Sequence, residues 1–322
     1  MIEQWKHILN ERAAAWRVPS GGEWKCLFFN NYQPNYSTIT LLWFHGGDAF
    51  PAVVTKLFRS PEIPQREFDS LVYAHSKVPA IVPRPLHVGR EGNFWALWME
   101  GVPGFPAKAE DMASANLRSL VQSVVSLHSV PLRFAAPDAA ERYRRLVSQP
   151  LEAVSAFGSS PAVRQGCAGL RTAIAPGDMA ELRPIPQHGD LFAGNALLHE
   201  GRWRVIDWEN YGAIDLPFFD LLTLLISLLR TGCDSAAQWP QRLVKELPAA
   251  MALYAESLSL PQAAVRAVLP LTLANWFYVQ WCDGRKEFAE RMYRTIEDYF
   301  QNTAIWQAAF TGSDARQRPA AA

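Results

Sequence analysis

The fold of this chain is decided by two short stretches, Gln187–Asn195 (QHGDLFAGN) and Val205–Glu209 (VIDWE). The residues between them form two short apolar segments on either side of Glu200-Gly201, a pattern typical of a β-hairpin. Because a hairpin brings its two ends together, we expect Asn195 and Asp207 to lie side by side although they are distant in the sequence.

The spacing of three oxygen-bearing side chains in these stretches suits phosphoryl transfer. Asp190 is the candidate base, because a carboxylate within hydrogen-bond reach of a hydroxyl can orient it and accept its proton. Asn195 follows five positions later and Asp207 ends a short apolar strand, so an amide and a second carboxylate could hold Mg²⁺. Taken singly, the alternatives are ordinary: a tight turn at Asp190, a helix cap at Asn195 and a turn residue at Asp207.

These residues resemble the aminoglycoside phosphotransferase and choline kinase family, whose pattern is HGDLHxxN followed by IDWE. The likeness runs from about Cys26 to about Tyr299, and it departs at Phe192, where the family often has His. The resemblance implies an α+β, two-lobed protein-kinase-like fold, with a small antiparallel sheet and one helix in the N-terminal lobe and a mostly helical C-terminal lobe. It also implies ATP and Mg²⁺ as cofactors.

The periodicity of the chain agrees with two lobes followed by a tail. Residues 1–101 form the predicted N-terminal lobe, 102–310 the C-terminal lobe and 311–322 a disordered tail, with Val102-Pro103-Gly104 as the hinge. In the N-terminal lobe a helix is expected over 2–17, strands over 24–30, 38–44 and 52–58, a helix over 66–76, and strands over 86–89 and 94–99. In the C-terminal lobe helices are expected near 138–156, 161–174, 216–230, 239–257, 261–282 and 284–307.

The resemblance also assigns nucleotide-binding residues. Lys56 ends a segment close to the V-A-I-K pattern and would reach the phosphates while pairing with Glu67 on the next helix. The Glu100 carbonyl would accept a hydrogen bond from the adenine amine, and the Val102 N–H would donate to a ring nitrogen. Taken alone, a lysine in a strand and a glutamate in a helix are usually solvated charges.

The loop expected to cover the phosphates, residues 31–37, contains no glycine. Protein kinases use a glycine-rich loop whose backbone N–H groups approach the phosphates closely. Here Asn31, Asn35, Ser37 and Thr38 would have to contact the nucleotide through side chains or through a different turn, and this departure bears on nucleotide affinity. The chain has neither a Walker A motif nor GxGxxG, so nothing supports a P-loop or Rossmann interpretation.

Two residues are candidates for contacting the substrate that accepts the phosphate: Asp215 and Trp276. Asp215 and Asp220 resemble the family's GDPxxDL segment: Asp220 is expected to tie the catalytic loop to the following helix, whereas Asp215 could contact substrate or cap a helix. Trp276 could line a pocket with other late aromatic residues, although helical spacing favours a core role. Three nearby acids, Asp283, Glu287 and Glu290, could attract a cationic substrate. The basic residues interleaved with them, Arg285, Lys286 and Arg291, indicate a mixed solvated face instead.

Composition limits the possible partners. Lys plus Arg and Asp plus Glu both number 31, so the net charge is zero and a broad nucleic-acid surface is not expected. The polar N-terminus and the short apolar run 216–229 predict neither a signal peptide nor a membrane span. Four scattered cysteines are expected to be reduced, buried thiols in a cytoplasmic protein. We expect a monomer or homodimer.

The resulting hypothesis is an ATP-dependent kinase acting on a hydroxyl group of a small metabolite or antibiotic. The alternative is a catalytically silent, nucleotide-binding kinase-like regulatory protein, which the glycine-free loop favours. A protein kinase fits less well, because only thirteen positions separate Asp207 from Asp220 and no A-P-E motif occurs. That spacing leaves no room for a segment on which a polypeptide could dock.

Overall fold

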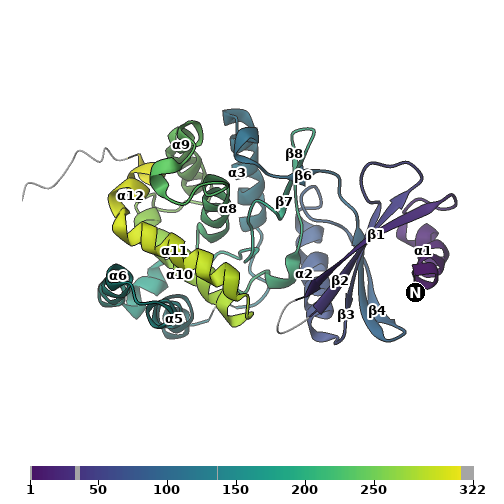
Figure 1. Ribbon diagram of the computed structural model, residues 1–322, viewed down its shortest axis with the longest axis horizontal. Coiled ribbons are helices and arrows are strands. Elements are labelled where there is room, and N and C mark those ends of the chain that lie inside the picture. Colours follow the sequence, from purple (N-terminus) through teal and green to yellow (C-terminus); the bar gives the residue numbers. More distant parts are fainter. Residues whose placement is uncertain (1, 33–36, 136, 313–322) are drawn as a thin grey trace, which may run out of the picture. The chain divides into compact units, whose positions relative to one another are not determined.

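The structure, a computed structural model, describes residues 2–32, 37–135 and 137–312 (Figure 1). The chain divides into two compact units, of which unit 1 comprises Met1–Pro106 and Asn195–Asn210, and unit 2 comprises Ala107–Gly194 and Tyr211–Ala322. The predicted fold class is confirmed: an antiparallel sheet dominates the N-terminal region and the remainder is mostly helical. Unit 1 therefore extends beyond the predicted boundary at Gly101, to Pro106, and it also includes the predicted hairpin that follows Asn195.

The main sheet of unit 1 has five antiparallel strands in the order β1-β2-β3-β5-β4. They span Trp24–Tyr32 (β1), Ser37–His45 (β2), Val53–Phe58 (β3), Pro85–Glu91 (β4) and Phe94–Glu100 (β5). In the register, Thr40 of β2 pairs with Lys56 of β3, and Lys56 pairs with Leu97 of β5. Since paired residues point to the same side, these three share one face of the sheet.

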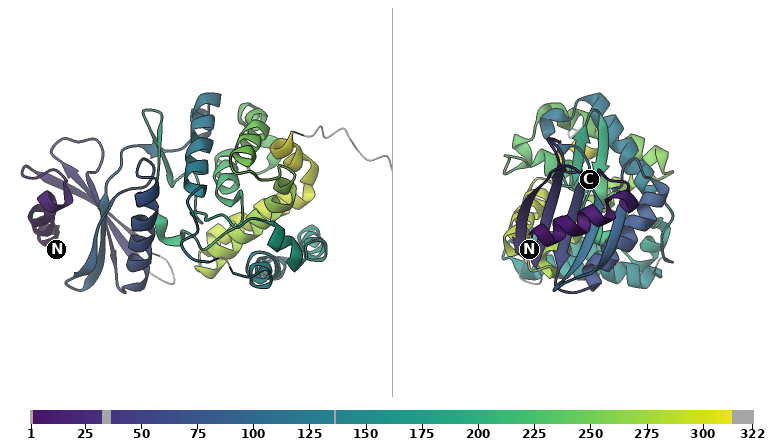
Figure 2. Two further views of the ribbon diagram at one scale, coloured as in Figure 1. Left: turned by 180° about the vertical axis from the view of Figure 1, so that it is seen from behind. Right: turned by 90° about the vertical axis from the view of Figure 1, so that its right-hand side faces the viewer.

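Helices α1 (Ile2–Trp16) and α2 (Glu62–Lys77) lie on opposite faces of this sheet, as Figures 1 and 2 both show. The α1 face carries the core of the unit, where Trp5 and Trp16 pack on Trp98 with ring centroids 5.7 and 5.1 Å apart. Trp43, fully buried beside them, donates from Nε1 to Thr55 Oγ1 at 3.0 Å. Burial of these large rings fixes the sheet whose other face holds Lys56.

A second, three-stranded sheet completes unit 1. Strands β7 (Ala196–His199) and β8 (Arg202–Val205) form the predicted hairpin, and the short β6 (Phe105–Pro106) pairs with β7. The turn uses Glu200 and Gly201, both with positive φ, as a tight hairpin requires. After β8 the chain enters a single 3-10 turn, η3 (Trp208–Asn210).

Unit 2 is built mainly from helices. The long ones are α3 (Ser114–His128), α8 (Phe219–Leu229), α9 (Gln241–Ser257), α10 (Ala264–Cys282) and α11 (Lys286–Gln301). The shorter ones are α4 (Ala139–Tyr143), α5 (Gln149–Phe157), α6 (Pro161–Ala173), α7 (Pro176–Glu181) and α12 (Thr303–Thr311). A five-residue π-helical segment joins α4 to α5, and almost every side chain of α8 is buried.

Two helix predictions were wrong in their bounds, and one helix was not predicted. The helix expected over 284–307 is two helices, because the chain breaks at Asn302, whose side chain donates to Asp298 Oδ1 at 2.9 Å. The helix expected from residue 216 begins at Phe219, since Phe218 has φ +68° and cannot be helical. Helix α7 was not predicted at all. Helix α12 ends at Thr311, and the rest of the predicted tail, 313–322, lies outside the described residues.

Two expectations about the whole chain can be compared with the structure. Among the described residues, none of the helices combines the length and the hydrophobicity that a membrane crossing requires. All four cysteines lie among the described residues and none of them forms a disulfide, as expected, but only Cys167 is fully buried. Cys282 is exposed because it lies at the C-terminal end of α10, so the expectation of four buried thiols was wrong.

Candidate active site

Asn195 and Asp207 lie at the open end of the hairpin. The Ile206 N–H donates to the Asn195 carbonyl at 3.0 Å, one step beyond the last strand pair, Ala196 with Val205. The expectation that the hairpin makes these two residues neighbours is therefore confirmed. Asp207 itself has φ +71°, in the left-handed region that most residues avoid but aspartate and asparagine tolerate. Chain direction changes there, between β8 and the η3 turn.

Lys56 makes the central ion pairs of unit 1. Its Nζ lies 2.7 Å from Glu67 Oε1 and 2.5 Å from Asp207 Oδ1. The predicted pairing of Lys56 with Glu67 on α2 is thus present, and Asp207 joins the same ammonium group. The Glu67 side chain is fully buried, and its Oε1 also accepts the Trp208 N–H at 3.3 Å. Strand β3, helix α2 and the η3 turn are tied together through these contacts.

A third acid, Glu209, completes the group. One carboxylate oxygen from each of Glu67, Asp207 and Glu209 lies within 4.8 Å of the others. Glu209 is 8% exposed. The sequence analysis assigned it no role, although it follows Asp207 by only two residues; the η3 turn that contains it places its carboxylate beside that of Asp207.

This group contains more acidic than basic side chains. Burial raises the pKa of Glu67 to about 7, opposed by Lys56 and reinforced by the negative charges of Asp207 and Glu209. The pKa of Lys56 is raised: burial lowers it, but the attraction of Asp207, Glu67 and Glu209 outweighs burial. One ammonium group faces three carboxyl groups, so the site carries surplus negative charge when all three are ionised.

This surplus charge and these donor atoms fit a divalent metal ion. Mg²⁺ prefers hard oxygen ligands and usually takes only one or two from the protein, leaving the other positions to water and phosphate oxygens. Asp207 and Glu209 offer carboxylates, and Asn195, which is 7% exposed, offers an amide beside Asp207.

The predicted hinge follows β5. The Gly101 N–H donates to the Ala52 carbonyl at 2.9 Å, and a Cβ at Gly101 would lie 2.1 Å from the Pro51 carbonyl oxygen, so only glycine fits. Among the described residues, the Val102 N–H has no hydrogen-bond partner. The Glu100 side chain accepts from the Arg84 N–H and from Arg204, each at 3.1 Å, which fixes the end of β5.

An exposed apolar surface lies on the Lys56 face of the sheet. Leu27 pairs with Leu42 and Phe29 with Thr40, which puts both β1 residues on the face that carries Lys56. Leu27 is 59% and Phe29 45% exposed. The side chains of Asn31 and Ser37 and loop residues 33–36, to which phosphate contacts were assigned, lie outside the described part of the chain, whereas Thr38 is described and buried.

In unit 2, Asp220 holds the loop that carries Asp190. Its two carboxylate oxygens accept the backbone N–H groups of His188 and Gly189, the second at 3.0 Å, as the sequence analysis expected of Asp220. Gly189 has φ +85°, a conformation that suits glycine and exposes successive N–H groups to one acceptor. Thus α8, which begins with Phe219-Asp220, positions the residue immediately before Asp190.

A buried chain of hydrogen bonds supports Asp220 from behind. His128, the last residue of α3, lies 2.9 Å from Asp220 through Nε2 and 2.6 Å from the Tyr254 hydroxyl through Nδ1. Because a carboxylate only accepts, Nε2 donates to Asp220, and the tyrosine hydroxyl donates to Nδ1. Burial raises the pKa of Tyr254, which keeps that proton in place. Helices α3, α8 and α9 therefore meet at one acid.

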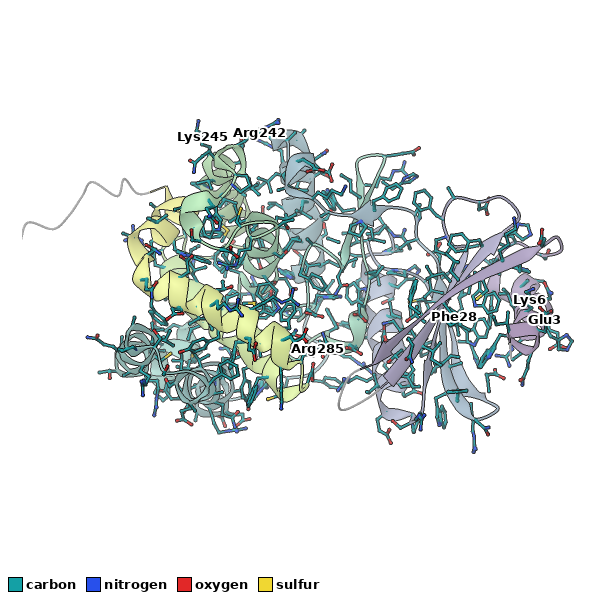
Figure 3. The ribbon with its side chains drawn as sticks, in the orientation of Figure 1. Glu3, Lys6, Phe28, Arg242, Lys245 and Arg285 are labelled. Atoms are coloured by element: carbon teal, nitrogen blue, oxygen red, sulfur yellow. The ribbon has the colours of Figure 1, made fainter. Side chains whose placement is uncertain are left out.

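Asp190 is 3% exposed, and two residues near the α10–α11 junction approach it. Gln280 Nε2 donates to Asp190 Oδ1 at 3.4 Å, and Arg285 Nη1 lies 4.0 Å from Asp190 Oδ2. Arg285, labelled in Figure 3, immediately precedes α11. The sequence analysis placed it on a mixed solvated face, which holds for Glu287, Glu290 and Arg291 but not for Arg285, whose side chain is 22% exposed.

The two residues predicted to contact the phosphate-accepting substrate, Asp215 and Trp276, are both buried. Asp215 accepts from Arg142 Nε at 3.1 Å, in an ion pair in which each side chain is almost wholly covered. Trp276 is 4% exposed and packs edge-on against Phe288, so the core interpretation holds for it. Trp281 and Tyr293 pack on Phe157 instead of forming a cage with Trp276. The Trp276 indole N–H has no hydrogen-bond partner among the described residues.

Residues 42–254, about two thirds of the chain, match the model of the phosphotransferase enzyme family. The chain belongs to the phosphotransferase enzyme family. Among curated proteins no sequence matches.

Several solved phosphotransferase and kinase structures share the fold at low sequence identity. Amicoumacin kinase hAmiN, in complex with AMP-PNP and Ca²⁺, is 16% identical, with a TM-score of 0.57 and 98% of each chain covered. A thermostable mutant of aminoglycoside phosphotransferase APH(4)-Ia, in a ternary complex with ADP and hygromycin B, is 12% identical, with a TM-score of 0.58, 92% of this chain covered and 97% of that one. Ethanolamine kinase from Plasmodium vivax is 12% identical, with a TM-score of 0.56 over 88% and 84%.

Proposed function

We propose that this phosphotransferase is a Mg²⁺-dependent small-molecule kinase that moves the γ-phosphoryl group of ATP to a hydroxyl of its acceptor. The observation that carries the proposal is the group formed by Lys56, Glu67, Asp207 and Glu209. A lysine paired with a helix glutamate, beside acids at the end of an apolar strand, is the arrangement that kinases use for nucleotide phosphates and their metal. Family membership supports it.

The nucleotide would bind on the Lys56 face of unit 1. Lys56 supplies positive charge to the phosphates once the metal relieves its contact with Asp207. The unpartnered Val102 N–H and the Glu100 carbonyl are the proposed hydrogen-bonding groups for adenine. Leu27 and Phe29 offer exposed apolar surface on the same face, which an adenine ring could cover. Ser37, at the start of β2, is proposed to contact phosphate.

Asn195 and Asp207 are the proposed metal ligands, and Glu209 the acid that joins them directly or through water. When bound, Mg²⁺ neutralises charge on the phosphate oxygens and orients them. Glu67 keeps its place beside Lys56 and so sets the position of the ammonium group. Because Asp207 contacts Lys56 and neighbours Asn195, one residue links phosphate binding and metal binding.

Asp190 is the proposed base. The acceptor hydroxyl oxygen forms a bond to the γ-phosphorus, the bond from that phosphorus to the β,γ-bridging oxygen breaks, and ADP leaves. The hydroxyl proton passes to the Asp190 carboxylate. Asp220 contributes by holding the His188 and Gly189 N–H groups, which fixes the loop immediately before the base.

The proposed acceptor is a small hydroxylated molecule. The solved relatives include a hygromycin B complex and kinases named for ethanolamine and amicoumacin, so antibiotics and amino alcohols are the first classes to test. Trp276 is proposed to donate its indole N–H to the acceptor, because a buried donor without a partner carries a desolvation cost that a ligand oxygen would offset. Asp215 is a weaker candidate because Arg142 already pairs with it.

The second candidate function is nucleotide binding without catalysis. The absence of glycine from residues 31–37 favours it, because side chains there hinder the close approach of backbone N–H groups to phosphates. Such a protein would bind ATP through the same lysine and acids yet transfer no phosphate. Its activity would be regulatory and would not depend on Asp190.

A transfer screen separates the two functions. The full-length chain is incubated with ATP and Mg²⁺ and with aminoglycosides including hygromycin B, choline, ethanolamine, homoserine and sugars, and each mixture is analysed by mass spectrometry for a phosphorylated product. A kinase yields one phosphorylated acceptor class, and the product disappears when Mg²⁺ is chelated. Binding of ATP with no product from any acceptor supports the silent alternative.

A further inference from the structure

The junction of α10 and α11 places two side chains against the proposed base. Helix α10 ends in a Schellman motif: Gly284, with φ +74°, donates its N–H to the Trp281 carbonyl at 3.0 Å, and the Arg285 N–H donates to the Gln280 carbonyl at 3.0 Å. This pair of bonds folds Arg285 back over the last turn of the helix. The backbone therefore holds residues 280 and 285 close together independently of any contact between their side chains.

The two side chains also bond to each other. Arg285 Nη1 donates to Gln280 Oε1 at 3.2 Å, and Gln280 is 1% exposed. A carboxamide can turn over and exchange its oxygen and nitrogen. With its oxygen engaged by Arg285, the Gln280 amide presents Nε2 to Asp190, the only orientation in which it can donate to a carboxylate.

Each oxygen of Asp190 thus has its own neighbour. Gln280 Nε2 lies 3.4 Å from Oδ1, and Arg285 Nη1 lies 4.0 Å from Oδ2. A hydrogen-bond donor and a nearby positive charge favour the ionised form of a carboxylate, which is the form able to accept a proton.

We propose that Gln280 and Arg285 are positioning residues that orient the Asp190 carboxylate and keep it ionised for proton transfer. The inference rests on the proposed function, because it assigns the two residues to the base of that reaction. Arg285 acts both directly, by its charge, and through Gln280, by fixing the direction of the amide. Neither residue is expected to contact the nucleotide.

A surface role is the competing explanation for Arg285. Its Nη2 also lies 3.9 Å from Asp283 Oδ2, and that contact alone could account for an arginine at a helix junction. A bridge confined to residues 283 and 285 would affect stability slightly and catalysis not at all. The two explanations therefore differ in what happens to turnover when Arg285 loses its charge.

The test uses the full chain, MgATP, and whichever of hygromycin B, choline and ethanolamine gives the fastest ADP release. Arg285→Met keeps the length of the side chain and removes the charge, and we expect kcat to fall by about 10- to 100-fold, as a misplaced catalytic group would cause. The KM for ATP stays unchanged. Arg285→Lys recovers part of the loss, and Gln280→Leu reproduces it. Arg294→Met, at an exposed arginine on α11, leaves kcat unchanged.

A double-mutant cycle identifies the residue through which Arg285 acts. In an Asp190→Asn background, Arg285→Met should cause no further loss, because there is no ionised base left to orient. An unchanged kcat in Arg285→Met, or an equal fold-loss with and without Asp190→Asn, would overturn the inference. If Arg285→Met does not fold, as judged by thermal unfolding, Arg285→Gln takes its place in the cycle.

The outcome also distinguishes this inference from the proposed function. If wild-type turnover equals that of Asp190→Asn, the function itself fails and the inference fails with it. If Asp190→Asn loses turnover while both Arg285→Met and Gln280→Leu retain it, the function stands and only the positioning roles are wrong.

Discussion

Lys56 Nζ lies 2.5 Å from Asp207 Oδ1, and this contact joins two residues that are 151 positions apart in the chain. It connects β3 of the five-stranded sheet to the end of the β7–β8 hairpin. Glu67 holds the same ammonium group from α2, at 2.7 Å. A lysine shared by two acids stays in place without a ligand, so the proposed phosphate site is formed in advance within unit 1.

The first prediction concerns Asp207 and the metal. Asp207→Asn should weaken Mg²⁺-dependent nucleotide binding by at least about 10-fold, because a neutral amide replaces a charged ligand. Asparagine is preferred to alanine because φ at this position is +71°, which asparagine tolerates and alanine does not. Calorimetric titration of ADP with Mg²⁺ and with EDTA measures the effect. Equal affinities for wild type and variant in Mg²⁺ would exclude Asp207 as a ligand.

The second prediction concerns Glu209, which sequence reasoning left without a role. Glu209→Gln should raise the Mg²⁺ concentration needed for half-maximal nucleotide binding by about 10-fold, as loss of a residue beside a metal typically does. The exposed Glu290→Gln serves as the matched control and should leave the Mg²⁺ requirement unchanged. A Glu209→Gln titration that overlays wild type would show that the third acid takes no part in metal binding.

The third prediction is a dependence of stability on pH, measured without metal. The pKa of Glu67 is about 7 in the folded protein, against an ordinary value of 4.5, so the folded state binds this proton more tightly. The resulting stabilisation is complete below pH 4.5 and is lost as the pH rises through 7. The unfolding free energy is measured by urea unfolding in EDTA from about pH 5 to 8. It should decrease more with rising pH in wild type than in Glu67→Gln, which lacks this ionisable group. Parallel curves for the two proteins would refute the assignment.

The fourth prediction concerns the support of the catalytic loop. Asp220→Asn removes one of two acceptor oxygens, so the N–H groups of His188 and Gly189 and the His128 ring can no longer all be satisfied. We expect a loss of about 2–4 kcal/mol in unfolding free energy, as for a broken buried charged hydrogen bond. Asp48→Asn, at an exposed turn, is the control. A thermal midpoint equal to wild type would show that Asp220 does not hold the loop.

The sequence predicted those parts of the site that depend on local structure. A turn at Glu200-Gly201 between two apolar segments makes Asn195 and Asp207 neighbours whatever the rest of the chain does. The pairing of Lys56 with Glu67 was predicted because Lys56 ends a segment close to the V-A-I-K pattern, in which the strand lysine pairs with an acid on the next helix. Both predictions rest on short-range geometry combined with one resemblance to a known family.

The parts that the sequence did not predict depend on packing between distant segments. Arg285 was placed on a solvated face because its neighbours are charged, and only the Schellman motif at Gly284 turns it toward Gln280 and Asp190. Helix α12 was missed for a similar reason: Asn302 breaks the helix by bonding to Asp298, which also accepts from Trp306. Charge patterns do not show which charged residue the fold covers.

The most direct test of the account compares Asp190→Asn with wild type in the same two assays, phosphoryl transfer from MgATP to the acceptor and calorimetric binding of MgADP. The account predicts that turnover falls by about 10²–10⁴-fold while the nucleotide dissociation constant is unchanged, because the base acts on the acceptor and not on the nucleotide. Turnover in Asp190→Asn equal to that of wild type would contradict it.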